Sequence, residues 1–225
     1  MPFGNIIGSA FLLAIIDWIA VLLAWKRVEY FTKPSVILLL LSWLILAGSQ
    51  NPHLWWFAAA LVFSLAGDIL LLLSNKFFLA GLFSFVLAHL AYVLGLNPTF
   101  PPINLASVVL FLVVGLTEVQ MYRFFFARLE SPEKIDFQKP AIIYLIAIGS
   151  MVFSALNTMV RPEMEWGIFP AILASAGALL FFSSDTLLAW NKFIHPTRAN
   201  RMTIIITYHL AQFALIIAAV TNYSY

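Results

Sequence analysis

Long apolar stretches are the feature that most constrains this chain. A helix that crosses the hydrocarbon core of a bilayer needs about 20 apolar residues in a row, and eight windows of this kind follow one another along the sequence. The windows are 3–25, 34–49, 54–74, 78–96, 103–121, 140–160, 167–190 and 201–221. Since 63% of the residues are hydrophobic and only 10% are charged, the chain has too few polar residues to cover a soluble domain. The sequence therefore predicts an all-α membrane protein, a single domain over residues 1–225 with about eight transmembrane helices.

Proline dipeptides lie between the apolar windows. Asn51-Pro52, Asn97-Pro98 and Arg161-Pro162 are typical of turns, because proline cannot donate a backbone hydrogen bond and disfavours helix in the residue before it. By the same argument, we expect Lys33-Pro34 and Lys139-Pro140 to mark the beginnings of the second and sixth helices.

Basic residues are concentrated in alternate loops. Of the 12 Lys and Arg residues, all except Arg161 lie in the first, third, fifth and seventh loops. Because positively charged loops stay in the cytoplasm, we expect these four loops to be cytoplasmic and both termini to lie on the opposite side. We expect the protein in the inner membrane of a bacterium.

Composition excludes several classes of function. The chain has no cysteine, so disulfides, thiolate catalysis and cysteine metal sites are ruled out. A net charge of +2 is too small for a nucleic-acid-binding surface. Serine-hydrolase, P-loop and dinucleotide-binding motifs are missing from the sequence. We predict no cofactor, no nucleic-acid partner and no particular protein partner.

Three short patterns recur in the second half of the chain. The matched pairs are Lys33-Pro34 with Lys139-Pro140, Gly67-Asp68-Ile69-Leu70-Leu71 with Ser184-Asp185-Thr186-Leu187-Leu188, and His89-Leu90-Ala91 with His209-Leu210-Ala211. Their offsets of 106, 117 and 120 residues are similar, which predicts a duplicated four-helix unit with halves 1–98 and 99–225. Because each unit has an even number of helices, both halves would share one orientation in the membrane.

Ionisable residues inside the apolar windows are the candidates for chemistry, because a charge in hydrocarbon is costly. They are Asp17, Asp68, His89, Glu118, Asp185 and His209. At about 1.5 Å of rise per residue, the two histidines, Asp17, Asp68 and Asp185 lie roughly 8 to 16 Å from the cytoplasmic helix ends. We therefore expect a cavity that opens toward the cytoplasm and brings these groups together.

Less specific roles compete for the same residues. A membrane aspartate can simply hold two helices together by hydrogen bonds, Glu118 can pair with Arg123 near the interface, and a histidine can be ordinary packing. A metal site could combine Asp68, Asp185, His89 and His209, but no HxxxH or HExxH spacing supports it. We predict no metal.

An ordered set of residues along nearly the whole chain resembles the YhhN family, whose characterised eukaryotic members are lysoplasmalogenases. The residues that carry the resemblance are Lys33-Pro34, Phe63-Ser64-Leu65-Ala66-Gly67-Asp68, Phe78, Gly81, Phe85, His89, Tyr92, Tyr144, Met151, Gly177-Ala178, Ser184-Asp185, Thr207-Tyr208 and Ala211-Gln212.

The resemblance implies an eight-helix membrane enzyme. Its expected reaction is hydrolysis of the vinyl ether bond of a lysoplasmalogen to a fatty aldehyde and glycerophosphoethanolamine or glycerophosphocholine. It also implies that Asp68 and Asp185 form the reacting pair. The family more often has an aromatic residue where this chain has His209, so a catalytic role for His209 is not implied.

Vinyl ether chemistry independently requires carboxylic acids. Protonation of the terminal vinyl carbon gives an oxocarbenium ion, which water captures to form a hemiacetal that collapses to aldehyde and alcohol. A buried pair of carboxylates can keep one member protonated while the other stays ionised, as in the related chemistry of glycosidases. One of Asp68 and Asp185 is therefore expected to be the acid, and the other to stabilise the cation or direct water.

Polar residues near these aspartates are the expected substrate contacts. A lysophospholipid would enter from the cytoplasmic leaflet, with its chain in the bundle and its head group near the interface. The candidates are Lys33 and Lys139 for the phosphate, with Ser64, His89, Tyr92, Ser184, Tyr208 and Gln212 nearer the reacting bond. The two lysines also suit the simpler role of cytoplasmic anchors.

Two other classes of function stay open on the sequence. A lipid or small-molecule transporter is the main alternative, because duplicated helical units with polar residues at their seam are common among transporters. A binding or assembly protein that catalyses no reaction is a further alternative. In that case Asp68→Asn would preserve function. Within the hydrolase interpretation, the substrate could also be a related lysolipid.

Overall fold

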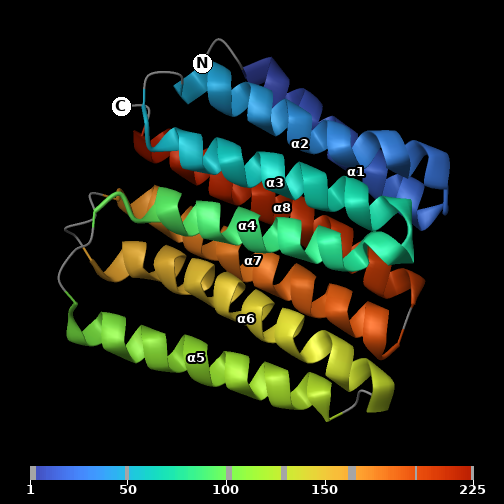
Figure 1. The fold of residues 1–225 in the computed structure, drawn as a ribbon. Helices are drawn as coiled ribbons and strands as arrows, with labels where there is room; N and C mark the ends of the chain where they lie inside the picture. The colour runs from blue at the N-terminus through green and yellow to red at the C-terminus, as the bar shows by residue number, and fades with distance from the viewer. Residues whose placement is uncertain are drawn as a thin grey trace.

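The computed structural model describes residues 4–48, 51–99, 103–127, 131–161, 166–195 and 197–223, and over these residues it is a bundle of long helices (Figure 1). The α-helices are α1 (Gly4–Leu22), α2 (Lys26–Gly48), α3 (Leu54–Leu73), α4 (Phe78–Leu96), α5 (Leu105–Phe126), α6 (Ser131–Val160), α7 (Ile168–Phe193) and α8 (Arg198–Tyr223). A short 3₁₀ turn, η1 (Asn75–Phe77), joins α3 to α4. All eight α-helices are long and apolar enough to cross a membrane, so the predicted membrane fold is confirmed.

Two predicted helix beginnings are wrong. Pro34 and Pro140 lie inside α2 and α6, which begin at Lys26 and Ser131. A proline in a helix removes one backbone hydrogen bond, and long membrane helices tolerate this loss because neighbouring helices support the freed backbone groups. As a result Lys33 lies about two turns inside α2, where its side chain can reach the interior of the bundle.

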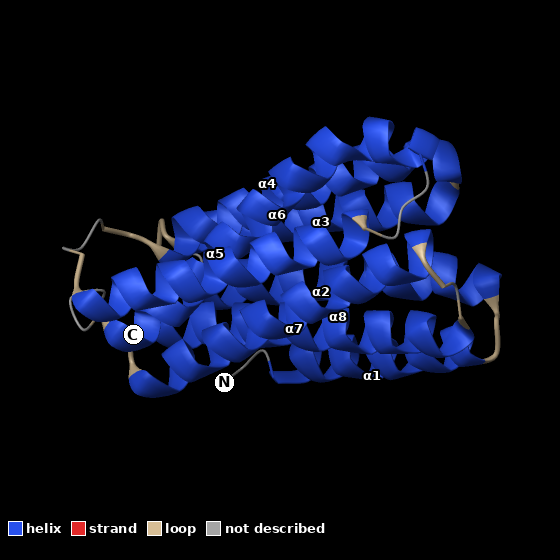
Figure 2. Ribbon diagram, turned by 90° about the horizontal axis from the view of Figure 1, so that it is seen from below, coloured by secondary structure: helices blue, strands red, loops and turns tan. Residues whose placement is uncertain are grey.

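Helices that follow one another in the sequence pack as antiparallel pairs. The pairs are α1 with α2, α3 with α4, α5 with α6 and α7 with α8. α4 also packs on α6, and α8 contacts α1, α2 and α3, so the last helix lies against the first half of the chain (Figure 1). The helices run alongside one another in a second view as well (Figure 2). α5 lies at one edge of the bundle and packs mainly on α6.

Both chain ends lie toward the same end of the bundle (Figure 1). The C-terminal ends of α1, α3, α5 and α7, which lead into the first, third, fifth and seventh loops, lie at the other end. These four loops are the ones that the distribution of Lys and Arg predicts to be cytoplasmic. The orientation itself stays a prediction.

Close packing of α3 on α4 depends on two glycines. A Cβ atom on Gly67 would lie 2.6 Å from Cε2 of Phe85, and one on Gly95 would lie 2.5 Å from Cε2 of Phe57. Both distances are too short for a real contact, so each aromatic ring fills the space that a side chain would need. Small residues of this kind let membrane helices approach closely, and the approach positions the Phe85 ring beside the candidate site.

Candidate active site

Asp68 lies in a charged cluster formed by three helices. Its carboxylate is completely buried on α3. The Lys33 ammonium from α2 lies 2.8 Å from Oδ1, and the Tyr208 hydroxyl from α8 donates to Oδ2 at 2.7 Å. The Lys33 ammonium also lies 5.4 Å from the centre of the Tyr208 ring. The fold thus gives this aspartate a positive partner and a hydroxyl donor.

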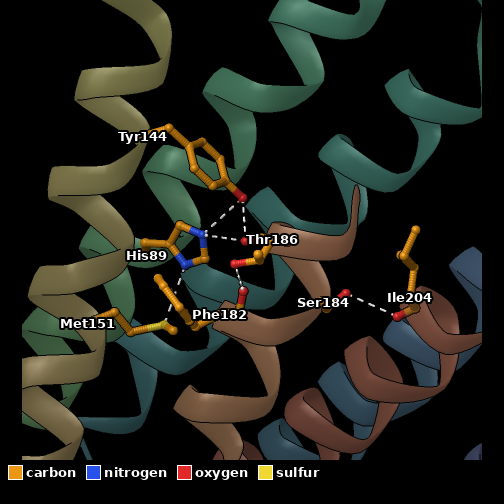
Figure 3. Close-up of polar contacts among 8 residues, drawn as sticks. His89, Tyr144, Met151, Phe182, Ser184, Thr186 and Ile204 are labelled. Carbon is orange, nitrogen blue, oxygen red and sulfur yellow. Dashed lines mark hydrogen bonds and ion pairs between the residues drawn. The ribbon is translucent and has the colours of Figure 1, made fainter. Parts of the chain in front are cut away.

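The partners of Asp185 are a tyrosine and a histidine, and neither has a fixed positive charge. The Tyr144 hydroxyl from α6 donates to Oδ2 of Asp185, and Nε2 of His89 from α4 lies 3.3 Å from the same oxygen. Tyr144 and His89 point toward one another (Figure 3), with 3.2 Å between the hydroxyl oxygen and Nε2. The other ring nitrogen of His89 lies 3.4 Å from the Met151 sulfur, which fixes the imidazole between α6 and α7.

An aromatic ring connects the two aspartate clusters. The Phe181 ring on α7 lies 4.8 Å from the His89 ring and 5.5 Å from the Tyr208 ring, centre to centre. The Phe85 ring contacts both Phe181 and Tyr208. Among the described residues the two carboxylates share no hydrogen-bond partner, so the structure brings the aspartates into adjoining clusters, each with its own donors.

A third polar group lies one turn farther from the predicted cytoplasmic end. The Tyr92 hydroxyl on α4 donates to Oε1 of Gln212 on α8, and both side chains are buried. Ser64 lies one turn before Asp68 on α3, and Gln212 one turn after Tyr208 on α8. Within the described part of the chain, the Ser64 hydroxyl and the Gln212 nitrogen have no hydrogen-bond partner. Buried polar atoms of this kind are usually satisfied by an ordered water or a ligand.

Three of the other residues considered lie away from these clusters. The Ser184 hydroxyl donates to the Ile204 carbonyl at 3.0 Å, which joins α7 to α8 (Figure 3). Lys139 is exposed on α6. His209 is buried and accepts a hydrogen bond from the Trp18 indole at 3.1 Å. The structure therefore gathers Lys33, Asp68 and Tyr208 in one cluster and His89 and Asp185 in the other, and leaves these three residues outside.

An apolar groove leads to Asp185 and not to Asp68. It lies between α4, α5, α6 and α7, in the half of the bundle opposite the chain termini, and we call it the α4–α7 groove. Its wall is lined by Phe78, Leu82, Met121, Tyr122, Phe125, Phe126, Phe137, Ala141, Tyr144, Leu145, Ile148, Phe182, Asp185, Thr186, Leu188, Ala189 and Phe193. Asp185 and Tyr144 thus both lie on the wall of this groove.

Tyr144 and Met151 are site residues that the sequence did not assign to the site. Neither is charged, so a search for ionisable groups in hydrocarbon passes over them. The available signals are their place among the residues that carry the family resemblance and their spacing of seven residues, which places both on one face of α6. That face packs on α4 and α7 and meets His89 and Asp185 there.

No metal site forms among the described residues, because no three His, Asp or Glu side chains converge. His89 and Asp185 meet each other, whereas Asp68 meets Lys33 and His209 meets Trp18. A cationic lysine against Asp68 supplies the positive charge that a metal would bring to that carboxylate.

The fold and the site together define a polytopic membrane protein with buried carboxylates, one of which is open to an apolar groove. The sequence profile of the YhhN family matches residues 28–220. The chain belongs to this family, so the resemblance seen in the sequence is confirmed.

Proteins named lysoplasmalogenase are similar to the chain over most of its length. It is 30% identical to lysoplasmalogenase TMEM86B of Mus musculus over 201 residues, which cover 88% of this chain and 77% of the mouse protein. It is 29% identical to lysoplasmalogenase TMEM86A of Homo sapiens over 165 residues, 72% of this chain and 64% of the human protein. No solved structure matches the chain.

Proposed function

We propose that this protein is a lysoplasmalogenase, a membrane hydrolase that cleaves the vinyl ether bond of a lysoplasmalogen. The products would be a fatty aldehyde and glycerophosphoethanolamine or glycerophosphocholine. The observation that carries the proposal is the position of Asp185, a carboxyl group on the wall of a mostly apolar groove. Similarity to the two lysoplasmalogenases over most of the chain supports the same reaction.

Asp185 is the proton donor in the proposed mechanism. Its proton goes to the vinyl carbon farther from the ether oxygen, and the electron pair of the double bond forms the new C–H bond. The adjacent carbon and the oxygen then share the positive charge of an oxocarbenium ion. Tyr144 and His89 hold the Asp185 carboxylate in one orientation, and both are therefore positioning residues.

Water completes the reaction by adding to the carbon of the oxocarbenium ion. The added water loses a proton to a carboxylate, which gives a hemiacetal. Collapse of the hemiacetal breaks the bond to the glycerol oxygen, which takes up the proton that the hemiacetal hydroxyl releases, and the aldehyde leaves. One water is consumed in total and the acid is regenerated.

Asp68 is the carboxylate that stays ionised in this scheme. An ammonium 2.8 Å from Oδ1 favours the charged state of a buried carboxylate electrostatically. The Ser64 hydroxyl and the Gln212 amide nitrogen have no hydrogen-bond partner among the described residues. They are next to this cluster and are suitable partners for the attacking water. Asp68 would direct that water toward the cation formed at Asp185.

The head-group contacts stay predictions. Lys33 already has Asp68 as its partner, so a phosphate would have to compete with a carboxylate for the ammonium. Lys139 is exposed near the predicted cytoplasmic end of α6. We propose Lys139 as the first of the two to meet the phosphate.

The test is aldehyde release from lysoplasmenylethanolamine by the purified protein in detergent. Wild type should release aldehyde, and Asp185→Asn should reduce the rate by about 10²-fold or more, the usual contribution of a general acid. Asp68→Asn should also reduce the rate. A chelator should leave the wild-type rate unchanged.

Ser184→Ala is a matched control on the same helix. Its hydroxyl bonds the Ile204 carbonyl and lies outside the proposed reaction, so this variant should keep most of the activity. Release of no aldehyde by folded wild-type protein would refute the proposed function and turn attention to lipid transport. Full activity of Asp185→Asn would refute the assignment of the acid.

A further inference from the structure

The α4–α7 groove has a nearly continuous hydrocarbon surface. Aromatic and aliphatic side chains from four helices make up most of its wall, and the polar exceptions are Tyr122, Tyr144, Asp185 and Thr186. The Thr186 hydroxyl is used within α7, where it donates to the Phe182 carbonyl at 2.8 Å (Figure 3). Polar chemistry in the groove is therefore concentrated where Tyr144 meets Asp185.

Charge excludes a phosphate head group as the occupant of this groove. Its lining, as far as the chain is described, contains an aspartate and no Lys, Arg or His. A phosphodiester placed there would face a carboxylate in a medium of low dielectric constant, without a basic partner, and such a burial is strongly unfavourable. An uncharged chain has no such penalty.

Aromatic rings line the groove at the end opposite the chain termini. The rings of Phe78, Phe137 and Phe193 come from α4, α6 and α7 and contact one another edge to face, with centre-to-centre distances of 5.0 to 6.1 Å. The Lys192 ammonium lies outside this group, 4.8 Å from the Phe78 ring. The end of the groove opposite the chain termini is therefore aromatic.

We propose that the α4–α7 groove binds the hydrocarbon chain of a single-chain ether lipid and determines the chain length that the protein accepts. This inference rests on the proposed lysoplasmalogenase function and specifies the part of the substrate that this surface recognises. The bilayer and the groove are both apolar, so the groove gains little from the hydrophobic effect. Its contribution is orientation, because a chain held in the groove keeps the vinyl ether beside Asp185.

Two alanines leave the space that a chain needs next to the reacting carboxyl. Ala141 lies one turn before Tyr144 on α6, and Ala189 lies one turn after Asp185 on α7. Because these helices are antiparallel, both alanines lie on the same side of the hydrogen bond between Tyr144 and Asp185. A large side chain at either position would fill the groove directly beside the site.

The experiment compares Ala189→Trp and Ala141→Trp with wild type, using lysoplasmenylethanolamines with short and long alkenyl chains. For the long chain, kcat/KM should fall by about 10- to 100-fold, the loss expected when a reacting group is misplaced by about 1 Å. For the short chain it should change by less than about threefold, a shift of under 1 kcal/mol. Ala80→Trp is the matched control, because Ala80 is exposed on α4 and does not line the groove.

Binding gives a second readout that needs no turnover. A saturated ether lysolipid lacks the double bond, and its long-chain form should bind wild type and the Ala80→Trp variant more tightly than the two groove variants. Thermal unfolding in detergent shows which variants are folded. Failure of wild type to release aldehyde would refute the proposed function. The binding comparison would still test whether the groove binds the hydrocarbon chain.

Either of two results would overturn the inference. One is that folded groove variants treat short and long chains alike, in turnover and in binding. The other is that the loss of kcat/KM and of binding depends on the head group, ethanolamine or choline, and not on the length of the alkenyl chain. A chain-length-dependent loss in both groove variants, and not in Ala80→Trp, would support it.

Discussion

Individual residues give the two buried aspartates different surroundings. Asp68 has an ammonium against one oxygen and a hydroxyl against the other. Asp185 shares one oxygen between a phenol and an imidazole. An ion pair favours a fixed carboxylate, whereas the Asp185 carboxyl has no Lys or Arg partner among the described residues and lies on the wall of the α4–α7 groove. This difference is the basis for assigning the two aspartates different roles.

Lys33→Met is predicted to destabilise the protein because it leaves the Asp68 carboxylate buried without its positive partner. Removal of one member of a buried ion pair typically costs about 3 to 5 kcal/mol, and Asp68 is completely buried. The measurement is thermal or denaturant unfolding of the purified protein in detergent.

The double variant Lys33→Met with Asp68→Asn is the control. It removes both charges and should recover most of the stability, because no uncompensated carboxylate remains. If Lys33→Met alone unfolds like wild type, the ion pair does not stabilise the fold and the argument for an ionised Asp68 loses its support.

Packing between helices controls the site from a distance. The Phe85 ring fills the space beside Gly67 on α3, and it also contacts Phe181 and Tyr208. Tyr208 in turn donates to Asp68. A shift of one ring at the contact between α3 and α4 would therefore move a hydrogen-bond donor of the proposed site.

Gly67→Ala is predicted to lower both stability and activity. The added Cβ would lie 2.6 Å from Cε2 of Phe85, and overpacking of a close-packed interior usually costs about 1 to 3 kcal/mol. The displaced ring should also lower aldehyde release, on the order of tenfold. Unfolding and aldehyde release in detergent measure the two effects.

Gly115→Ala is the matched control, because nothing lies within 4 Å of a Cβ at that position on α5. It should be neutral or slightly stabilising, since alanine favours helix over glycine by about 1 kcal/mol. Equal behaviour of the two alanine variants would show that the close approach of α3 to α4 is not required.

The whole molecule has features that a duplicated unit would produce. Tyr92 and Gln212 are 120 residues apart, the same offset as His89 and His209, and they hydrogen-bond to each other. In a two-fold arrangement, equivalent residues meet each other only close to the axis. The repeat with halves 1–98 and 99–225 stays a prediction that this contact supports.

Orientation in the membrane can be tested directly because the native chain has no cysteine. Lys76→Cys and Thr99→Cys place a single thiol at exposed positions near opposite ends of α4. In intact bacterial cells, a membrane-impermeant maleimide should label the thiol at position 99 and leave the one at position 76 unmodified, because basic loops face the cytoplasm.

Permeabilised cells provide the control, and there both positions should react. The reverse pattern in intact cells would place the basic loops outside. It would also move the α4–α7 groove and the Lys139 side chain to the other leaflet.

The sequence by itself determined the membrane class, the number of helices and the candidate aspartates. These follow from local properties: apolar runs of spanning length predict helices, and a carboxylate within such a run is costly enough to stand out. The predictions of helix boundaries were less accurate. A proline indicates the end of a helix only when no neighbouring helix supports the backbone groups that it leaves unbonded. Pro34 and Pro140 both lie inside helices.

Only the tertiary structure decided which polar groups meet. Tyr208 reaches Asp68 across 140 residues, and His89 reaches Asp185 across 96. His209 has the same His-Leu-Ala pattern as His89 and meets Trp18 instead. Such choices depend on helix rotation and on ring packing between α3, α4, α7 and α8, which no single helix specifies. The groove, the separate partners of the two aspartates and the position of Tyr144 beside Asp185 therefore follow from the packing of the bundle.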